Sequence, residues 1–216
     1  PQGLKHSEGT VKALILTNEF PPNIYGGAGV HVDYLTRELA RAIDVEVRCF
    51  GEQREARPGL AVRGYGAPQT LLGEADPRVR GAFDALGRGI EFAASGGVVA
   101  VVHCHSWYSH FGGLLVKMAY GVPLVVTVHS LEPLRPWKRE QLGGGYDVSS
   151  WVEKTALESA DAIIAVSAGA REDILRLFDV DPARVHVIHN GIDTDEYRPL
   201  ATTDTLERFG IDPARP

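Results

Sequence analysis

The sequence predicts an α/β fold, in which a Rossmann-like, doubly wound parallel sheet of six or seven strands is covered by helices on both faces. Short apolar runs alternate with amphipathic segments along most of the 216 residues. The runs are continuously hydrophobic, which is typical of strands buried on both faces of a parallel sheet. Glycine is also abundant, at 24 residues, as tight turns between strands and helices require.

Four strands and two helices are expected in the first half of the chain. Apolar residues between Val32 and Ile43 recur at helical spacing, which predicts an amphipathic helix. Pro77 stands near the start of the next helix, where its missing N–H costs nothing. The expected strands cover 11–17, 45–50, 60–64 and 97–105, and the expected helices cover 32–43 and 76–94.

The second half continues the alternation around one irregular segment. Residues 131–149 contain Pro133, Pro136 and three consecutive glycines, and loops of that length in compact domains are usually functional or mobile. The expected helices cover 109–120, 150–159 and 168–178, the expected strands cover 122–129, 161–166 and 185–189, and a short helix is expected near 204–209.

These elements are assigned to one Rossmann-like domain over residues 11–200. Residues 1–10 are polar and contain no apolar signal segment, so they are expected to be disordered or foreign to the fold. Residues 201–216 form a polar tail, and the sequence contains no internal repeat or low-complexity stretch.

Composition narrows the class of partner. The formal net charge of −6 argues against nucleic acid or an anionic membrane, since both attract clustered Lys and Arg. The longest apolar stretches, 98–102 and 122–128, fall short of the roughly 18 residues that a membrane span needs. Two cysteines without a disulfide framework indicate a reducing compartment, so we expect a cytoplasmic protein.

A glycine loop is the first candidate binding element. Gly26–Gly29 precedes a predicted helix, whose free N–H groups and positive dipole end favour an anion such as phosphate. The alternative is a glycine turn that only lets the helix pack on its strand, and the two interpretations are about equally supported. The loop is not a dinucleotide fingerprint, because Val32 stands where a third small residue belongs.

Histidines are concentrated where the predicted strands end, and ligands bind at the carboxyl ends of such sheets. A metal site formed by His103, His105 and His110 is disfavoured, because no carboxylate or cysteine completes a familiar ligand spacing. Imidazoles beside aromatic rings better suit hydroxyl-rich ligands, whose apolar sugar faces pack on those rings. The residues at the strand ends are His103, His105, Trp107, Tyr108, His129 and His189.

Three other functions stay open on the residues alone. Ser167 follows a predicted strand like a hydrolase nucleophile, with Asp179 or Asp181 and His189 in the right order; the favoured alternative is an N-cap of the 168–178 helix. A nicotinamide-dependent oxidoreductase would use the glycine loop and Glu52. A stand-alone carbohydrate-binding module would need no further domain.

Six motifs together resemble the retaining GT-B glycosyltransferases of family 4. Within that family they look most like bacterial glycogen synthases, some of which make maltose 1-phosphate. The resemblance runs in the correct order from about residue 11 to about residue 200. The motifs are NEFPP (18–22), GGAGVHV (26–32), HCHSW (103–107), VTVHS (126–130), EKTALESADAIIAVS (153–167) and HNGID (189–193).

The resemblance implies a two-domain GT-B architecture of which this chain is the amino-terminal, acceptor-side half. Residues 201–216 are then a linker toward a carboxy-terminal domain. The donor-binding Arg/Lys pair and the acidic E-x7-E motif of that second domain are not in this sequence, so the isolated chain is expected to be inactive. No cofactor and no metal are implied.

Family membership also implies site roles. His129 matches the catalytic histidine that steadies charge at the anomeric carbon of the donor sugar. No protein nucleophile is required, because the leaving phosphate helps to deprotonate the acceptor hydroxyl. The donor phosphate and sugar are expected at Gly26, Gly27 and Asn190, and the acceptor at His105 and Trp107.

The implied reaction moves glucose from a nucleotide-sugar to an α-1,4-glucan or to glucose 1-phosphate, in glycogen biosynthesis. ADP-glucose is expected over UDP-glucose by family alone. Starch-synthase-type relatives carry Lys-Thr where this chain has Ile24-Tyr25, and Asp where it has Ser106. Both differences leave the choice between a long glucan and a small sugar phosphate open.

Overall fold

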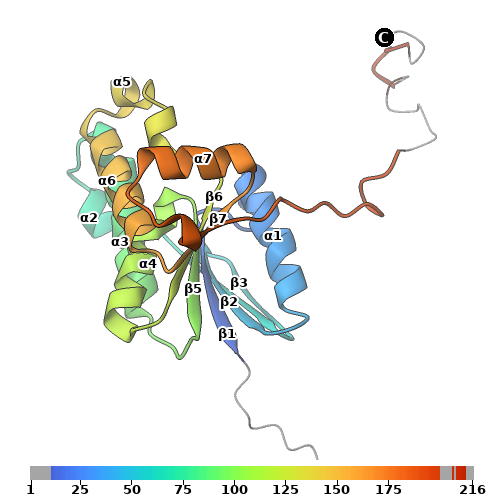
Figure 1. The fold of residues 1–216 in the computed structure, drawn as a ribbon, viewed down its shortest axis with the longest axis horizontal. Coiled ribbons are helices and arrows are strands. Elements are labelled where there is room, and N and C mark those ends of the chain that lie inside the picture. The colour runs from blue at the N-terminus through green and yellow to red at the C-terminus, as the bar shows by residue number, and fades with distance from the viewer. Residues whose placement is uncertain (1–10, 200–205, 207, 213–216) are drawn as a thin grey trace, which may run out of the picture.

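The sheet and its helices are seen in a computed structural model that describes residues 11–199, 206 and 208–212 (Figure 1). The prediction for residues 1–10 lies outside this part of the chain. Most of the 201–216 tail, including half of the short helix expected near 204–209, also lies outside the described residues.

Within the described residues, eight strands form one sheet in the order β3-β4-β2-β1-β5-β6-β7-β8. All neighbouring pairs are parallel except β3 and β4, so the predicted α/β class is confirmed. The strands are β1 (Lys12–Leu16), β2 (Asp44–Phe50), β3 (Arg54–Arg57), β4 (Leu60–Tyr65), β5 (Val101–His105), β6 (Leu124–Val128), β7 (Ala162–Ala165) and β8 (Val185–Val187).

The strand that the sequence analysis missed is β3. Its four residues, Arg-Glu-Ala-Arg, are all exposed at the edge of the sheet. Because an edge strand needs no apolar face when no helix covers it, its polar sequence resembles a loop. The prediction of six or seven strands was therefore one or two too few.

The two faces of the sheet carry separate cores. Along β1, Ala13 and Ile15 pack on one face with Val32 of α1, whereas Leu14 and Leu16 belong to the core on the opposite face. Residues of α3, α4, α6 and α7 complete that second core. The helices are α1 (Gly27–Leu39), α2 (Gln69–Leu72), α3 (Pro77–Ala94), α4 (Trp107–Tyr120), α5 (Lys138–Leu142), α6 (Gly144–Ser159) and α7 (Ala168–Leu177).

Segment 131–149 is more regular than the sequence predicted. It contains the 3-10 turn Glu132–Leu134, α5, and the first turns of α6, which begins at Gly144 rather than at Ser150. The third of the consecutive glycines, Gly145, is needed for packing. A Cβ on Gly145 would come within 2.4 Å of the Arg78 carbonyl oxygen, so glycine lets α6 approach the start of α3 closely.

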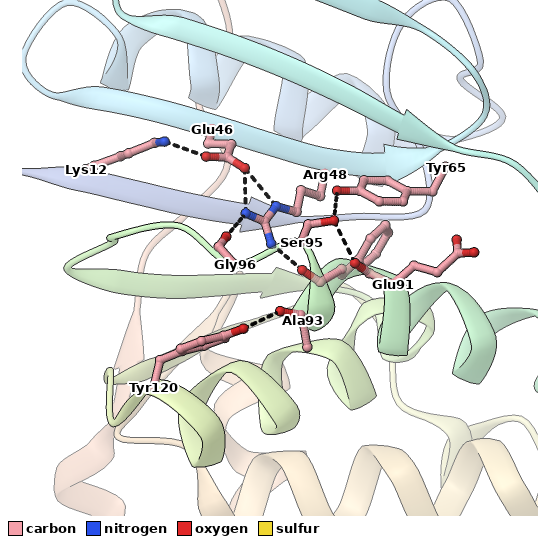
Figure 2. A network of polar contacts seen from close by, with 10 residues as sticks. Lys12, Glu46, Arg48, Tyr65, Glu91, Ala93, Ser95, Gly96 and Tyr120 are labelled. Carbon is pink, nitrogen blue, oxygen red and sulfur yellow. Dashed lines mark hydrogen bonds and ion pairs between the residues drawn. The ribbon is translucent and has the colours of Figure 1, made fainter.

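A buried arginine ties the end of α3 to the sheet (Figure 2). Arg48 of β2 is 2% exposed, and its guanidinium donates to the carbonyls of Phe92 and Gly96 and to Glu46 Oε1. Lys12 of β1 pairs with the other oxygen of Glu46 at 2.5 Å. Arg48 therefore satisfies the Phe92 carbonyl in the last turn of α3 and the Gly96 carbonyl just beyond the end of that helix.

No helix in the described part of the chain is long and apolar enough to cross a membrane.

Candidate functional site

A pocket of about 400 Å³ opens at the carboxyl edge of the sheet. Its walls come from the segments after β1, β5, β6, β7 and β8 and from the start of α1, as expected for a doubly wound sheet. Five of the six residues predicted for the site line it, namely Gly26, Gly27, Trp107, His129 and Asn190.

The glycine loop forms one wall of the pocket. The N–H groups of Tyr25 and Gly26 donate to Glu19 Oε2 at 2.9 and 2.8 Å, which fixes the loop at the start of α1. Among the described residues no side chain caps α1, so its first free N–H groups and its positive dipole end are open to a ligand.

The glycines of this loop have two different surroundings. A Cβ on Gly26 or Gly27 would meet nothing within 4 Å, so packing does not require glycine at either position. A Cβ on Gly29 would lie 2.8 Å from Glu19 Cβ, so this buried position needs glycine for helix packing. The bare backbone at 26 and 27 fits a ligand that approaches it closely.

His129 lines the pocket directly after β6, and its ring lies in a cluster with the rings of His31 and His105. Its Nε2 lies 3.1 Å from His105 Nδ1, and its ring centroid lies 5.0 Å from that of His31 on α1. Burial and the nearby His31 lower the pKa of His129 to about 4. The ring is therefore neutral at pH 7, and it can accept or donate one hydrogen bond without adding charge.

His105 and Trp107 were both predicted to line the acceptor side, and the structure places them differently. His105 is fully buried in β5, where it contacts His129 rather than the pocket. Trp107 lines the pocket at the first position of α4 and stacks on Tyr108, with ring centroids 4.2 Å apart. The aromatic surface that sugar binding would use is thus formed by Trp107 and Tyr108.

Ser106 holds the turn between β5 and α4 in a conformation that is rare for its residue type. Its φ of 64° and ψ of 156° lie in a region that glycine favours, and its hydroxyl donates to Asn18 Oδ1 at 2.8 Å. Such conformations cost about 1–3 kcal/mol and cluster at functional sites. Both Ser106 and Asn18 line the pocket.

Two cations in the pocket were missed by the sequence analysis. Arg135 and Lys138 line the pocket from the segment after β6, which the sequence analysis treated as irregular. Lys138 Nζ pairs with the buried carboxylate of Glu132 at 2.8 Å. The signal that could have identified them was the presence of basic residues shortly after the strand that His129 follows.

A family model described as Glycosyltransferase Family 4 matches residues 25–196. The chain belongs to this family. The α-maltose-1-phosphate synthase of Mycolicibacterium smegmatis is 46% identical over 214 residues, covering 95% of this chain and 52% of the relative. A D-inositol 3-phosphate glycosyltransferase of Frankia alni is 31% identical over 206 residues, covering 87% of this chain and 48% of the relative.

Solved structures show the same fold. Sucrose-phosphate synthase from Thermosynechococcus elongatus matches with a TM-score of 0.68 at 18% identity, over 95% of this chain and 54% of that one. Anabaena HepE in complex with UDP and glucose matches with a TM-score of 0.66 at 15% identity, over 93% of this chain and 50% of that one. The family 4 chain spans about half the length of the curated relatives it matches, as the GT-B resemblance predicted.

The serine hydrolase alternative has no support in this family 4 domain. Ser167 Oγ accepts the Ala170 N–H at 3.0 Å, so the predicted N-cap of α7 is confirmed. His189 Nδ1 lies 3.2 Å from the Val166 carbonyl oxygen, and among the described residues no hydrogen bond joins His189 to the Ser167 hydroxyl. Glu52, which the oxidoreductase alternative required, does not line the pocket.

The group of histidines that could hold a metal shares only His105 with the trio that the sequence analysis considered and disfavoured. His31, His105 and His129 offer ligand atoms that lie within 4.8 Å of one another. His103 is engaged elsewhere, since its Nε2 lies 2.7 Å from Thr127 Oγ1. His110 is buried on α4, and neither of its ring nitrogens has a hydrogen-bond partner in the described part of the chain. Neutral imidazoles of this kind are the form that binds Zn²⁺.

Proposed function

We propose that this chain is the amino-terminal, acceptor-side half of a retaining glycosyltransferase that moves glucose from a nucleotide-sugar to glucose 1-phosphate or an α-1,4-glucan. Residues 11–200 form its first domain, and 201–216 lead toward a second domain that supplies most of the donor site. ADP-glucose is the donor that we expect. The observation that carries the proposal is a pocket in which the open amino end of α1 and the neutral imidazole of His129 face the same space.

Several observations support this assignment beyond family membership. The relatives include synthases named for maltose 1-phosphate and transferases named for inositol 3-phosphate. HepE was solved with UDP-glucose, and starch synthase IV from Arabidopsis thaliana was solved with ADP and acarbose. A nucleotide-sugar is therefore the donor class that the fold accommodates, and phosphorylated small molecules are named among the relatives.

The pocket suggests how its residues act. The donor phosphate lies at the amino end of α1, where free N–H groups and the helix dipole stabilise the leaving diphosphate. As the bond from the anomeric carbon to that phosphate breaks, positive charge develops on the sugar beside His129. The acceptor oxygen bonds to the same face of the anomeric carbon and passes its proton to the leaving phosphate.

A neutral His129 suits this role. A protonated imidazole would repel the developing positive charge, whereas a neutral His129 presents the dipole of its ring and its backbone carbonyl to that charge. Glu19 is the only carboxylate on the pocket walls in the described part of the chain, and it already accepts two backbone N–H groups. The lack of a carboxylate pair on these walls supports electrostatic stabilisation by this half of the enzyme over a paired-carboxylate mechanism.

The proposal is tested with the full-length protein that contains this chain. We expect radiolabelled glucose from ADP-glucose to appear in maltose 1-phosphate or in glycogen, with retained α configuration. His129→Ala should lower kcat by about 10²–10³-fold, the range for loss of one group that stabilises transition-state charge. His189→Ala, at an exposed position outside the pocket walls, is the matched control. Near-normal turnover of the His129 variant would contradict the assigned role.

A further inference from the structure

We propose that Arg135 and Lys138 form a subsite for the phosphate group of a phosphorylated sugar acceptor. This inference rests on the proposed glycosyltransferase function and decides between its two acceptors, in favour of the sugar phosphate over the neutral glucan.

Arg135 is the clearest sign of an anionic ligand. It is half-buried on the wall of the pocket. The side chains of the described residues offer its guanidinium no hydrogen bond or ion pair. A guanidinium presents several N–H donors in a fixed plane that matches phosphate geometry, and leaving it without an anion in a pocket is unfavourable.

Lys138 provides the second cation, and the fold holds it in place. Its side chain is 19% exposed, and its Nζ lies 2.8 Å from Glu132 Oε1. One turn of backbone separates it from Arg135, since the Lys138 N–H donates to the Arg135 carbonyl at 3.0 Å. The two cations therefore belong to one short structured unit rather than to a loose loop.

Buried polar contacts fix this unit to α6. Glu132 is 1% exposed, and its second carboxylate oxygen accepts the Ser149 hydroxyl at 2.9 Å. Its N–H donates to Glu153 Oε2 at 2.8 Å, and its carbonyl accepts the Tyr146 hydroxyl at 2.9 Å. Because every polar group of Glu132 is engaged or paired, the segment that carries Arg135 and Lys138 is preorganised.

The charges of this unit leave a positive surplus at the pocket. Burial raises the pKa of Glu153 to about 8, so this carboxyl is neutral at pH 7. Glu132 carries one negative charge, which Lys138 balances. Arg135 therefore lines the pocket without a compensating charge in the unit, and the Glu19 carboxylate, which also lines the pocket, accepts the N–H groups of Tyr25 and Gly26.

The position of Arg135 and Lys138 indicates that they bind the phosphate of the acceptor rather than that of the donor. The amino end of α1 follows β1, whereas Arg135 and Lys138 follow β6, and β5 lies between these two strands in the sheet. The donor diphosphate is already provided for at α1. A neutral glucan offers no group that needs two cations, but a sugar phosphate does.

The test compares two acceptors in the full-length protein. Initial rates are measured with ADP-glucose as donor and either glucose 1-phosphate or glycogen as acceptor. Arg135→Gln and Lys138→Gln are expected to raise the KM for glucose 1-phosphate about ten- to hundredfold, as for loss of a charged hydrogen bond. The KM for ADP-glucose should change less than twofold. Arg139→Gln removes the same charge from an exposed neighbour that pairs with Asp147 outside the pocket, and it should change neither KM.

The buried contacts of Glu132, which hold Arg135 and Lys138 in place, can be tested with variants of Glu153. Glu153→Ala removes the acceptor of the Glu132 N–H and should raise the KM for glucose 1-phosphate while leaving the KM for ADP-glucose unchanged. Glu153→Gln keeps a neutral side chain with an accepting oxygen, so it should restore the wild-type KM. If Glu153 had only a structural role, Glu153→Ala would lower kcat and would raise the KM values for glucose 1-phosphate and for ADP-glucose together.

Each contrary result has a distinct meaning. If the variants at 135 and 138 raise the KM for ADP-glucose as much as that for glucose 1-phosphate, these cations bind the donor diphosphate and the subsite is refuted. If the wild-type protein transfers glucose to glycogen but neither uses nor binds glucose 1-phosphate in calorimetry, the subsite fails and the glycosyltransferase function stands. If no acceptor is glucosylated and no sugar phosphate binds, both proposals fail.

Discussion

At the residue scale, the glycines of the α1 loop show how one residue type serves two purposes. Gly29 is required by the packing of α1 against Glu19, whereas Gly26 and Gly27 border open space in the pocket. Sequence spacing alone left the loop equally consistent with a phosphate site and a packing turn. The structure supports a packing role for Gly29 and leaves the phosphate role of the first two glycines as a proposal.

The loop can be tested by adding one methyl group at a time. Gly27→Ala should leave the melting temperature unchanged or slightly higher, because alanine lowers the entropy of the unfolded chain, but it should raise the KM for the nucleotide-sugar. Gly29→Ala should destabilise the protein by about 1–3 kcal/mol, the usual cost of overpacking. Thermal unfolding and donor KM are measured for both variants. Equal effects of the two substitutions on stability would contradict this division.

At the scale of the elements, the carboxyl end of α3 depends on a side chain from the sheet. Arg48 donates to two carbonyls there while its charge is balanced by Glu46, and nearby the Tyr120 hydroxyl donates to the Ala93 carbonyl at 2.7 Å (Figure 2). Arg48 is buried at the centre of this network and none of these residues lines the pocket, so the network contributes to stability rather than to chemistry.

Arg48→Met should lower the free energy of unfolding by about 3–5 kcal/mol, because it leaves buried carbonyls and the Glu46 carboxylate with fewer partners. Urea denaturation followed by circular dichroism measures the change. Arg41→Met is the control, since Arg41 pairs with Glu38 on the exposed surface of the molecule and such pairs contribute little. A loss no larger than that of the control would show that water or neighbouring side chains replace the guanidinium.

At the scale of the whole molecule, buried neutral histidines make stability depend on pH. Burial lowers the pKa of His110 to about 3, against 6.5 in the unfolded chain. Between these values the unfolded state binds more protons, so stability falls as pH falls below about 6.5. Glu153 acts in the opposite sense, because its raised pKa of about 8 makes the folded state hold the extra proton between about 4.5 and 8.

The contribution of one histidine can be isolated by difference. Wild-type protein should lose about 1.6 kcal/mol more stability than His110→Leu between pH 6.5 and pH 5, because the unfolded histidine is already half protonated at pH 6.5 and the slope then approaches about 1.36 kcal/mol for each pH unit. Neither ring nitrogen of His110 has a hydrogen-bond partner in the described residues, so leucine removes the titration without removing a hydrogen bond. Denaturation curves at the two pH values provide the measurement. Identical pH slopes for the two proteins would contradict the prediction.

The parts that sequence could predict are those governed by hydrophobic pattern. Apolar runs located the central strands, and the rule that ligands bind at carboxyl strand ends located the pocket. The edge strand β3 was not predicted because its residues are mostly charged. The start of α6 was not predicted because glycine there packs against α3 rather than breaking the helix. Arg135 and Lys138 could not be assigned, since their place depends on the buried contacts of Glu132.

The charged edge strand has a consequence for how the molecule behaves in concentrated solution. A sheet edge normally offers unpaired backbone groups to which a second chain can add a strand, and this is one route to aggregation. Here that edge is β3, a strand of only four residues that carries two arginines and a glutamate, all exposed. At the opposite edge, β8 is just three residues long. Both edges are therefore poor templates for strand addition, which disfavours edge-to-edge pairing of the eight-stranded sheet with its copies.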